Sequence, residues 1–212
     1  MHYLISSIIG YLLGSIPTAY LLLKSRKGLD ITRSGSGNVG AMNSYEVTNS
    51  KSIGVIVLII DALKGVLSVL VIGLIYSDSF ILPAISLLFA VFSHCYNPWI
   101  GFRGGRGLAT AAGGTLILFP FLLVVWVVLW VIFYLLKKDI LIGNISATIF
   151  SIFLVFNTSD IAMKYANPRP ESENDIIFFT ICGLLIIFIR HMEPLKEIIS
   201  RIKKSGVKND KS

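Results

Sequence analysis

The stretch LATAAGGTLILFPFLLVVWVVLWVIFYLL, residues 108–136, is an apolar run of 29 residues. A helix that crosses a bilayer needs only about 20 apolar residues. Pro120 stands near the middle of the run, behind a cluster of small residues. Proline removes a backbone hydrogen bond and clashes with the preceding turn, so it breaks or kinks a helix. The stretch therefore predicts two short helices, at about 107–119 and 120–136.

Five more apolar runs cover residues 3–23, 53–76, 80–97, 139–157 and 174–190. The chain is 54% hydrophobic with a mean hydropathy of +0.77, values typical of an integral membrane protein. The first run lacks a basic leader and a small-residue cleavage site, which favours a retained helix over a signal peptide, and Pro17 within it predicts a kink. We expect an all-α membrane protein with one polytopic domain, residues 1–200, and a basic cytoplasmic tail, residues 201–212.

Basic residues decide between six and seven membrane spans. With the long run split in two, sixteen of the 19 Lys and Arg residues fall on one side of the membrane, in segments 24–52, 98–107, 137–138 and 190–212. The positive-inside rule then predicts seven transmembrane helices, with the N-terminus outside and the C-terminus inside. The net charge of +7 fits this topology and anionic lipid headgroups better than it fits nucleic acid, which we do not expect as a partner.

Two glycine-rich segments, SGSGNVGAMN (34–43) and FRGGRGLAT (102–110), interrupt the apolar sequence. Both fall on the predicted cytoplasmic side. Backbone N–H groups in glycine-rich turns bind anions, and the planar guanidinium groups of Arg103 and Arg106 match phosphate oxygens. Ser36, Asn38 and Asn43 supply hydroxyl and amide groups suited to phosphate or polyol. The pair predicts a site for phosphorylated substrates; tight turns with headgroup-bound arginines are the alternative.

The GxGxxG pattern at Gly35 does not indicate a dinucleotide fold, because a polar loop precedes it instead of a strand. His94 and His191 each end an apolar run near these segments, where a histidine either binds substrate, moves a proton or simply hydrogen-bonds. Asp61 and Lys64 share one face of a span, as a structural or a substrate-facing pair. Neither histidine begins an HxxxxD signature. The spacing of Cys95 and Cys182 suggests neither a metal site nor a disulfide framework.

Together the motifs resemble the bacterial acyl-phosphate-dependent glycerol-3-phosphate acyltransferases. GSIP (14–17), SGSGNVGAMN, DALKG (61–65), SHCYNPWIGFRGGRGLAT (93–110) and RH (190–191) occur in the order and spacing of that family. The resemblance implies a seven-helix, multi-pass inner-membrane enzyme with its active site on the cytoplasmic side. Such an enzyme transfers a fatty acyl group from acyl phosphate to the 1-hydroxyl of glycerol 3-phosphate in phospholipid biosynthesis, without cofactor or metal.

The resemblance also implies site residues. Ser36, Arg106 and His191 match the family's functional serine, the lysine of its phosphate loop and its functional histidine. We expect catalysis by positioning the two anions, with the acyl chain among apolar helices, and with the departing phosphate or His94 taking the hydroxyl proton. The further residues expected to bind substrate are Gly37, Asn38, Asn43, Lys64, His94, Arg103, Gly104, Gly105, Gly107 and Thr110.

Three positions depart from the family pattern. Glu46 replaces an arginine, Pro194 replaces an asparagine, and Lys208 falls near the place of a glutamate. Each change removes a group implied in substrate binding or in holding the site together. An acyltransferase with a changed acceptor, a non-enzymatic anion transporter and a degenerate membrane scaffold therefore remain alternatives. Fatty acyl phosphate, glycerol 3-phosphate and membrane lipid are the expected partners.

Overall fold

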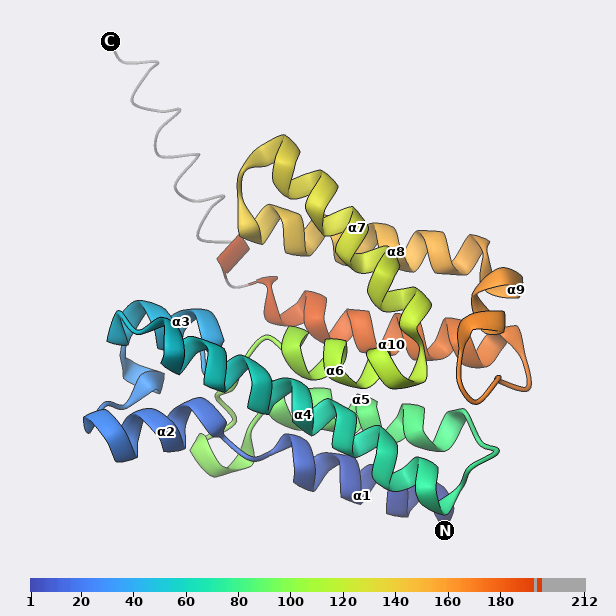
Figure 1. The fold of residues 1–212 in the computed structure, drawn as a ribbon, viewed down its shortest axis with the longest axis horizontal. Coiled ribbons are helices and arrows are strands. Elements are labelled where there is room, and N and C mark those ends of the chain that lie inside the picture. Colours follow the sequence, from blue (N-terminus) through green and yellow to red (C-terminus); the bar gives the residue numbers. More distant parts are fainter. Residues whose placement is uncertain (193, 196–212) are drawn as a thin grey trace.

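The computed structural model describes residues 1–192, 194 and 195, and these residues form helices joined by short connections (Figure 1). The predicted tail, residues 201–212, lies outside the described part. The long helices are α1 (His2–Gly14), α2 (Thr18–Lys27), α4 (Lys51–Ile75), α5 (Ile81–Cys95), α6 (Leu108–Leu118), α7 (Pro120–Lys137), α8 (Ile140–Asn157) and α10 (Glu173–Arg190). The short ones are α3 (Ala41–Thr48), α9 (Ser159–Ala162) and the 3-10 turns η1 (Ile31–Arg33), η2 (Pro98–Ile100) and η3 (Met163–Tyr165).

The break predicted in the long apolar run is confirmed. Helix α6 ends at Leu118, Phe119 turns the chain, and α7 begins at Pro120. Proline is well suited to the first position of a helix, where its missing N–H costs no hydrogen bond. Phe119 is fully buried, and its ring packs edge-on against Phe179 of α10. The break thus lets α7 leave the α4–α6 layer and pair with α8 (Figure 1).

The first apolar run, expected as one helix with a kink at Pro17, is instead divided into α1 and α2. The break frees backbone carbonyl groups that a bilayer could not hydrate, so other groups must satisfy them. Lys64 Nζ donates to the carbonyl oxygen of Ile16 at 2.6 Å, and Asn97 Nδ2 donates to that of Ser15 at 2.6 Å. Side chains from α4 and from the segment after α5 therefore stabilise the break.

Small residues bring the helices close together. Helix α1 packs on α5 and α4 packs on α6, while α10 contacts both α5 and α8. Any side chain at Gly14 would collide with the backbone of Ala90, and one at Gly113 would collide with that of Ala62. Such close approach is typical of helix packing in membranes, where dispersion contacts replace the hydrophobic effect.

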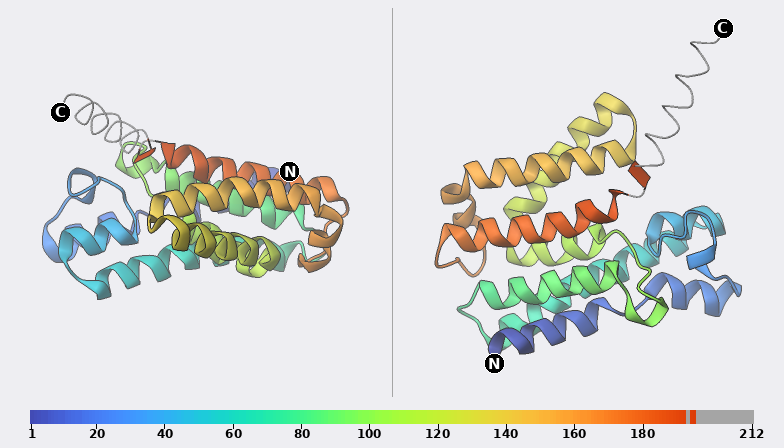
Figure 2. Two further views of the ribbon diagram at one scale, coloured as in Figure 1. Left: turned by 90° about the horizontal axis from the view of Figure 1, so that it is seen from above. Right: turned by 180° about the vertical axis from the view of Figure 1, so that it is seen from behind.

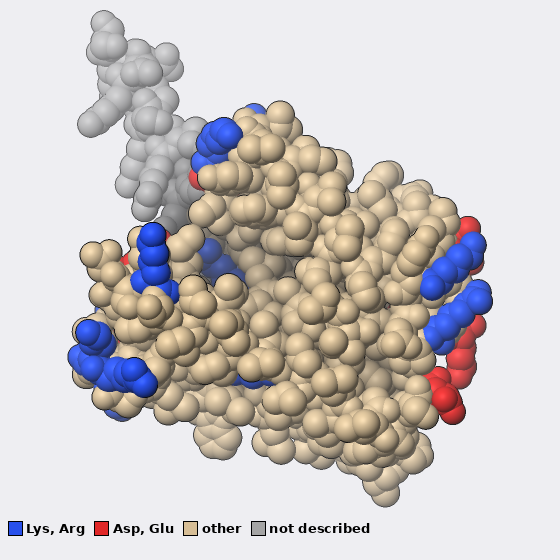
Figure 3. Space-filling model, viewed as in Figure 1, with Lys and Arg blue, Asp and Glu red and all other residues tan. Residues whose placement is uncertain are grey.

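Among the described residues, four helical stretches are long and apolar enough to cross a membrane: His2–Lys27, Lys51–Ile75, Pro120–Lys137 and Ile140–Asn157. Helices α5 and α6 are shorter but also apolar. Figure 3 shows a largely uncharged band between two charged ends: the end near α2 and α3 is mainly basic, and the opposite end carries acidic side chains together with some basic ones. The distribution agrees with an integral membrane protein and with the sided charge expected from the sequence.

The segments that interrupt the apolar sequence meet at one end of the bundle. Both views in Figure 2 place α2, η1 and α3 at this end, together with the carboxyl end of α10. The turn between α5 and α6 also lies there, closed by an antiparallel bridge between Asn97 and Arg103. The opposite end carries the connections around α9. The fold thus gathers both glycine-rich segments into one place.

Candidate active site

A polar cavity of about 690 Å³ lies where the two glycine-rich segments meet. We call residues 34–43 the first loop and residues 101–107 the second loop. In Figure 3, basic side chains lie set back in a hollow at this end of the molecule. The cavity is lined by Gly35, Ser36, Gly37, Asn38, Phe102, Arg103, Gly104, Arg106, Arg190 and Pro194. Three of these described residues are arginines and none is acidic, so the cavity suits a ligand with several negative charges.

Asn43 holds the first loop from within. Its Oδ1 accepts the backbone N–H of Ser36 at 3.1 Å, and its Nδ2 donates to the carbonyl oxygens of Ser34 (3.1 Å) and Asn38 (2.9 Å). The side chain is 1% exposed, so these bonds occupy an amide that water does not reach. Asn43 was expected to bind substrate; the structure places it behind the loop, where it orients Ser36 and Asn38.

Arg190 holds the second loop from the end of α10. Its Nε donates to the carbonyl oxygen of Gly105 at 3.2 Å and its Nη2 to that of Gly104 at 3.3 Å, while its guanidinium lies over the ring of Tyr96. The N–H of Gly105 donates to the carbonyl oxygen of His94 at 3.1 Å. Arg190 thus contacts the cavity and also fixes the loop that forms one of its walls.

The two loops are also joined directly. The backbone N–H of Val39 in the first loop donates to the carbonyl oxygen of Gly104 in the second at 3.1 Å. Arg103 extends toward the segment before the first loop, with its Nη1 at 3.5 Å from both oxygens of Thr32. The Thr32 hydroxyl donates to Asp30 at 2.7 Å and lowers the pKa of that carboxyl below its usual value. Asp30 and Thr32 thereby orient Arg103 at the cavity rim.

His191 lies beside the cavity without lining it. The ring is 1% exposed; its Nδ1 is 2.7 Å from the carbonyl oxygen of Ile187, and its Nε2 is 3.4 Å from Nδ2 of Asn144. Because a carbonyl oxygen only accepts, Nδ1 carries the proton and Nε2 is left to accept from the Asn144 amide. In this arrangement His191 orients Asn144, and its expected contact with substrate is indirect.

Three other expected substrate-binding residues lie in the helix interior. Lys64 pairs with Asp61 at 2.6 Å and is 4% exposed; His94 Nδ1 lies 3.9 Å from the same carboxylate, and its Nε2 packs against Gly105. Thr110 is fully buried, and the close approach of Gly65 to its carbonyl oxygen joins α4 to α6. The fold thus assigns Lys64 and His94 to holding helices and the second loop in place, and it puts Thr110 outside the polar cavity's lining.

The remaining expected residues divide between the cavity and its supports. Ser36, Gly37, Asn38, Arg103, Gly104 and Arg106 line the cavity as expected. Gly105 packs under the His94 ring, and Gly107, with a φ of +81°, caps the start of α6. Of the positions that depart from the family pattern, Glu46 is exposed on α3 and outside the lining, Pro194 lines the cavity, and Lys208 lies outside the described residues.

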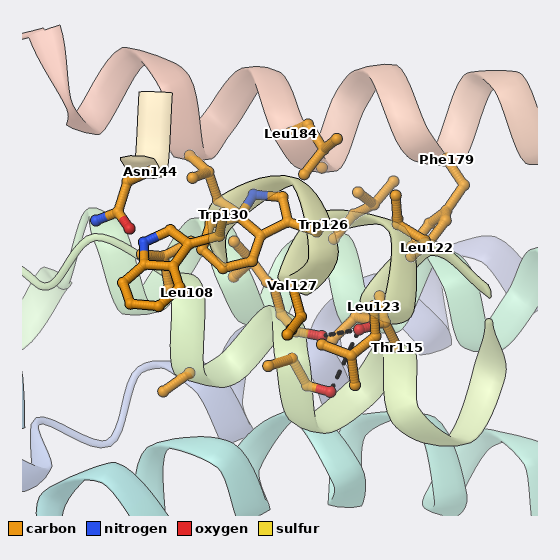
Figure 4. A pocket seen from close by; sticks show the side chains of 18 of the residues that line it. Leu108, Thr115, Leu122, Leu123, Trp126, Val127, Trp130, Asn144, Phe179 and Leu184 are labelled. Carbon is orange, nitrogen blue, oxygen red and sulfur yellow. Dashed lines mark hydrogen bonds between the residues drawn. The ribbon is translucent and has the colours of Figure 1, made fainter. Parts of the chain in front are cut away.

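An apolar cavity of about 430 Å³ lies among α5, α6, α7 and α10. Asn144, Trp130 and Leu108 lie together at one of its ends, and Phe179 and Leu122 lie at the other (Figure 4). Leu108 follows Arg106 and Gly107 of the second loop, and Asn144 contacts His191. The end marked by Asn144 is therefore the one nearest the polar cavity, which suits a ligand with a charged head and an apolar chain.

The sequence did not indicate that Arg190 holds the second loop, or that Asn144 contacts His191 at the end of the apolar cavity nearest the polar one. Arg190 stood out only as part of the RH motif (190–191) and as a basic residue at the end of the last apolar run. Asn144 had a clearer signal, because a polar side chain within an apolar span usually has a functional or structural partner. Its partner, His191, is 47 positions away, so the sequence did not indicate the pairing.

Comparison with known proteins agrees with this geometry. The sequence profile of the glycerol-3-phosphate acyltransferase family matches residues 4–201. A curated relative, glycerol-3-phosphate acyltransferase 2 of Moorella thermoacetica, is 39% identical over 153 residues, which cover 72% of this chain and 77% of the relative.

Two crystal structures of PlsY, an integral membrane glycerol 3-phosphate acyltransferase, have the same fold. The glycerol 3-phosphate form superimposes with a TM-score of 0.77 and the lysophosphatidic acid form with 0.76; each is 29% identical and covers 94% of this chain and 93% of PlsY. The profile match and the identity to the Moorella protein place this chain in the glycerol-3-phosphate acyltransferase family.

Proposed function

We propose that this membrane enzyme transfers a fatty acyl group from acyl phosphate to the 1-hydroxyl of glycerol 3-phosphate, giving lysophosphatidic acid and phosphate. Membership of the family makes the chain an acyltransferase that acts on glycerol 3-phosphate. The observation that supports acyl phosphate as the donor is the presence of one polar and one apolar cavity in the bundle. One is lined by three arginines and two glycine-rich loops, and the other is apolar, with its end at Leu108 and Asn144 nearest the second loop.

The cavity residues divide into two groups. Arg103, Arg106 and the backbone N–H of Gly104 bind the phosphate of the donor, because the N–H groups of other second-loop residues, Gly105 among them, already donate to carbonyl oxygens of the protein. Ser36 and Asn38 of the first loop bind glycerol 3-phosphate through their hydroxyl and amide groups. Arg190 adds positive charge between the loops and offsets the repulsion of two anions held close together. The acyl chain lies in the apolar cavity.

Acyl phosphate is already activated, so no enzyme nucleophile is required. The 1-hydroxyl oxygen forms the new ester bond to the carbonyl carbon, the bond from that carbon to the phosphate oxygen breaks, and the electron pair leaves with phosphate. His94 is enclosed beneath Gly105, so we assign the hydroxyl proton to the departing phosphate. Catalysis then rests on positioning and on a preorganised positive site.

The proposed topology has seven transmembrane helices, α1–α2, α4, α5, α6, α7, α8 and α10, with the N-terminus outside. The active site then faces the cytoplasm across the inner membrane. Supporting this, the basic side chains of the described residues gather at the end that holds the polar cavity (Figure 3), as the positive-inside rule requires.

The test is a transfer assay with purified protein, palmitoyl phosphate and radiolabelled glycerol 3-phosphate, scored for lysophosphatidic acid. We expect product that depends on acyl phosphate and is not formed from acyl-CoA. Product formed only from acyl-CoA would overturn the donor. Product formed with another polyol phosphate, and none with glycerol 3-phosphate, would indicate a changed acceptor. Binding of glycerol 3-phosphate without product, or its uptake into proteoliposomes, would favour a scaffold or a transporter.

A further inference from the structure

Gly183 lies in the interior of α10 and lines the apolar cavity. Glycine is a poor choice for a helix interior, because it loses more conformational freedom than alanine on folding and weakens the helix. A glycine at such a position therefore has a role other than forming the helix.

Other glycines of the bundle are required because two helices pack closely at them, but close helix packing does not explain Gly183. A side chain at Gly113 would collide with the backbone of Ala62, so α4 and α6 require that glycine. At Gly183 an added Cβ would meet only Leu88 Cδ2, at 3.4 Å, an ordinary van der Waals contact. No neighbouring backbone therefore excludes a side chain at this position.

Gly183 lies about halfway along the apolar cavity, where the absence of a side chain leaves the passage to its far end open. Three helices run beside the cavity from its polar end to its far end: from Leu108 to Thr115 on α6, from Trp130 to Leu122 on α7, and from Ile187 to Phe179 on α10. At 1.5 Å per residue these segments are about 10–12 Å long. Gly183 is midway between Ile187 and Phe179, so a side chain there would divide the cavity.

We propose that Gly183 determines which acyl chain lengths the enzyme accepts, by keeping open the far half of the apolar cavity, between Trp126 and Phe179. This inference rests on the proposed function, because it assigns the donor's acyl chain to this cavity. A chain in one leaflet of a bilayer spans about 15 Å, so a long chain fills the whole cavity. A four-carbon chain is about 4 Å long on the same scale, so it ends before Gly183 and does not contact a side chain placed there.

The test compares butanoyl phosphate with palmitoyl phosphate as donors for Gly183→Leu, Gly183→Ala and the parent. Gly183→Leu lowers the ratio of kcat/KM for palmitoyl over butanoyl phosphate by about tenfold or more, the effect of ~1.4 kcal/mol and within the range for overpacking an apolar site. Its kcat/KM for butanoyl phosphate stays within about threefold of the parent. Gly183→Ala gives a smaller decrease of the ratio together with a higher Tm, since alanine favours the helix.

The matched control is Gly73→Leu in α4. A Cβ at Gly73 meets nothing within 4 Å, and Gly73 does not line the cavity, so the chain-length ratio stays at the parental value. A Gly183→Leu ratio equal to the parental one overturns the proposal. So does a Gly183→Ala variant with a lower Tm and an unchanged ratio, because that result assigns the glycine to packing.

Binding of butyl and hexadecyl phosphate, two unreactive analogues, separates this inference from the proposed function. If the parent transfers no acyl group, the proposed function fails, yet these ligands still test the cavity. Weaker binding of hexadecyl phosphate alone, in Gly183→Leu, supports the chain-length role. Equal weakening of both ligands, or of neither, contradicts it. If Gly183→Leu does not fold, the same comparison is made with Gly183→Ala.

Discussion

The two glycine-rich loops form one cavity but are held in different ways. The first loop is closed by Asn43, whose three partners lie within nine residues along the chain. The second loop is held by Arg190, which is 85 residues from Gly105, and by the carbonyl oxygen of His94. The first loop is therefore stabilised by one of its own residues, whereas the second adopts its conformation only when α10 has packed beside α5.

This difference matters for the proposed chemistry because the second loop supplies the phosphate-binding wall. Arg190 donates to carbonyl oxygens on the loop, which stabilises the arrangement in which Gly104 and Arg106 line the cavity. A change at the end of α10 should then act on donor binding, and a change at Asn43 should act on the acceptor side. Four substitutions test this division.

The largest effect is expected for Arg106→Ala. Removing a positioned cation from a phosphate site costs about 10²–10³-fold in rate, while the protein stays folded. Phosphate binding and kcat/KM with palmitoyl phosphate are the measurements, and Arg106→Lys should recover part of the loss. Lys137→Ala, at an exposed cation on α7, should stay within about twofold of the parent. Full activity in Arg106→Ala would remove this residue from the site.

Arg190→Gln should lower kcat/KM by about 30-fold, mainly through a higher KM for acyl phosphate. The variant loses two charge-assisted hydrogen bonds to the second loop, and ~2 kcal/mol corresponds to this factor. Steady-state kinetics with each substrate varied in turn measures the division. An increase confined to the KM for glycerol 3-phosphate would contradict the assignment of Arg190 to the second loop.

Asn43→Ala should reduce activity by about tenfold, with the larger change in the KM for glycerol 3-phosphate. It also leaves the Ser36 N–H and two carbonyl oxygens without their partner, which lowers the free energy of unfolding by about 1–3 kcal/mol. Thermal unfolding in detergent and kinetics measure the two effects. Asn157→Ala, an exposed asparagine on α8, is the control and should change neither.

Asp30→Asn should have the smallest effect, a decrease of about two- to threefold, because Asp30 is partly exposed and reaches the cavity only through Thr32 and Arg103. The Thr32 hydrogen bond lowers the folded-state pKa of Asp30. Its contribution is therefore complete above the unfolded pKa of about 4 and is lost as pH falls through the lower folded value. The activity ratio of variant to parent should stay constant from pH 5 to 8. A ratio that changes across that range would exclude this role.

The bounds of several helices and some of the residues that line the polar cavity could be predicted from composition and local sequence pattern. The apolar runs marked α4, α5, α8 and α10 nearly to their ends, because a helix in a membrane must satisfy its own backbone and therefore continues as long as the apolar residues do. Pro120 marked the division between α6 and α7. The cavity residues Ser36, Asn38, Arg103 and Arg106 stood out because polar and glycine residues are costly in such a chain unless they serve a site.

Other features could not be predicted from the sequence because they depend on contacts between residues far apart in the chain. The break at Ser15–Pro17 was expected as a kink within one helix, and it became a full interruption because Lys64 and Asn97 satisfy the carbonyl groups. The same contact explains why Lys64 does not reach the cavity. His94 looked like a proton acceptor beside a phosphate loop, yet the fold turns its ring against Gly105.

The sequence by itself determined that this chain is helical and membrane-embedded, and it indicated two polar glycine-rich loops with an arginine pair as the candidate site, since hydropathy and backbone freedom are local properties. The tertiary structure alone decided which polar residues face the cavity and which support it. Asn43, His94, Lys64 and Arg190 carry similar signals in sequence. Only the packing of α4, α5 and α10 determines whether water and ligand, or a buried carbonyl oxygen, occupies the space beside each side chain.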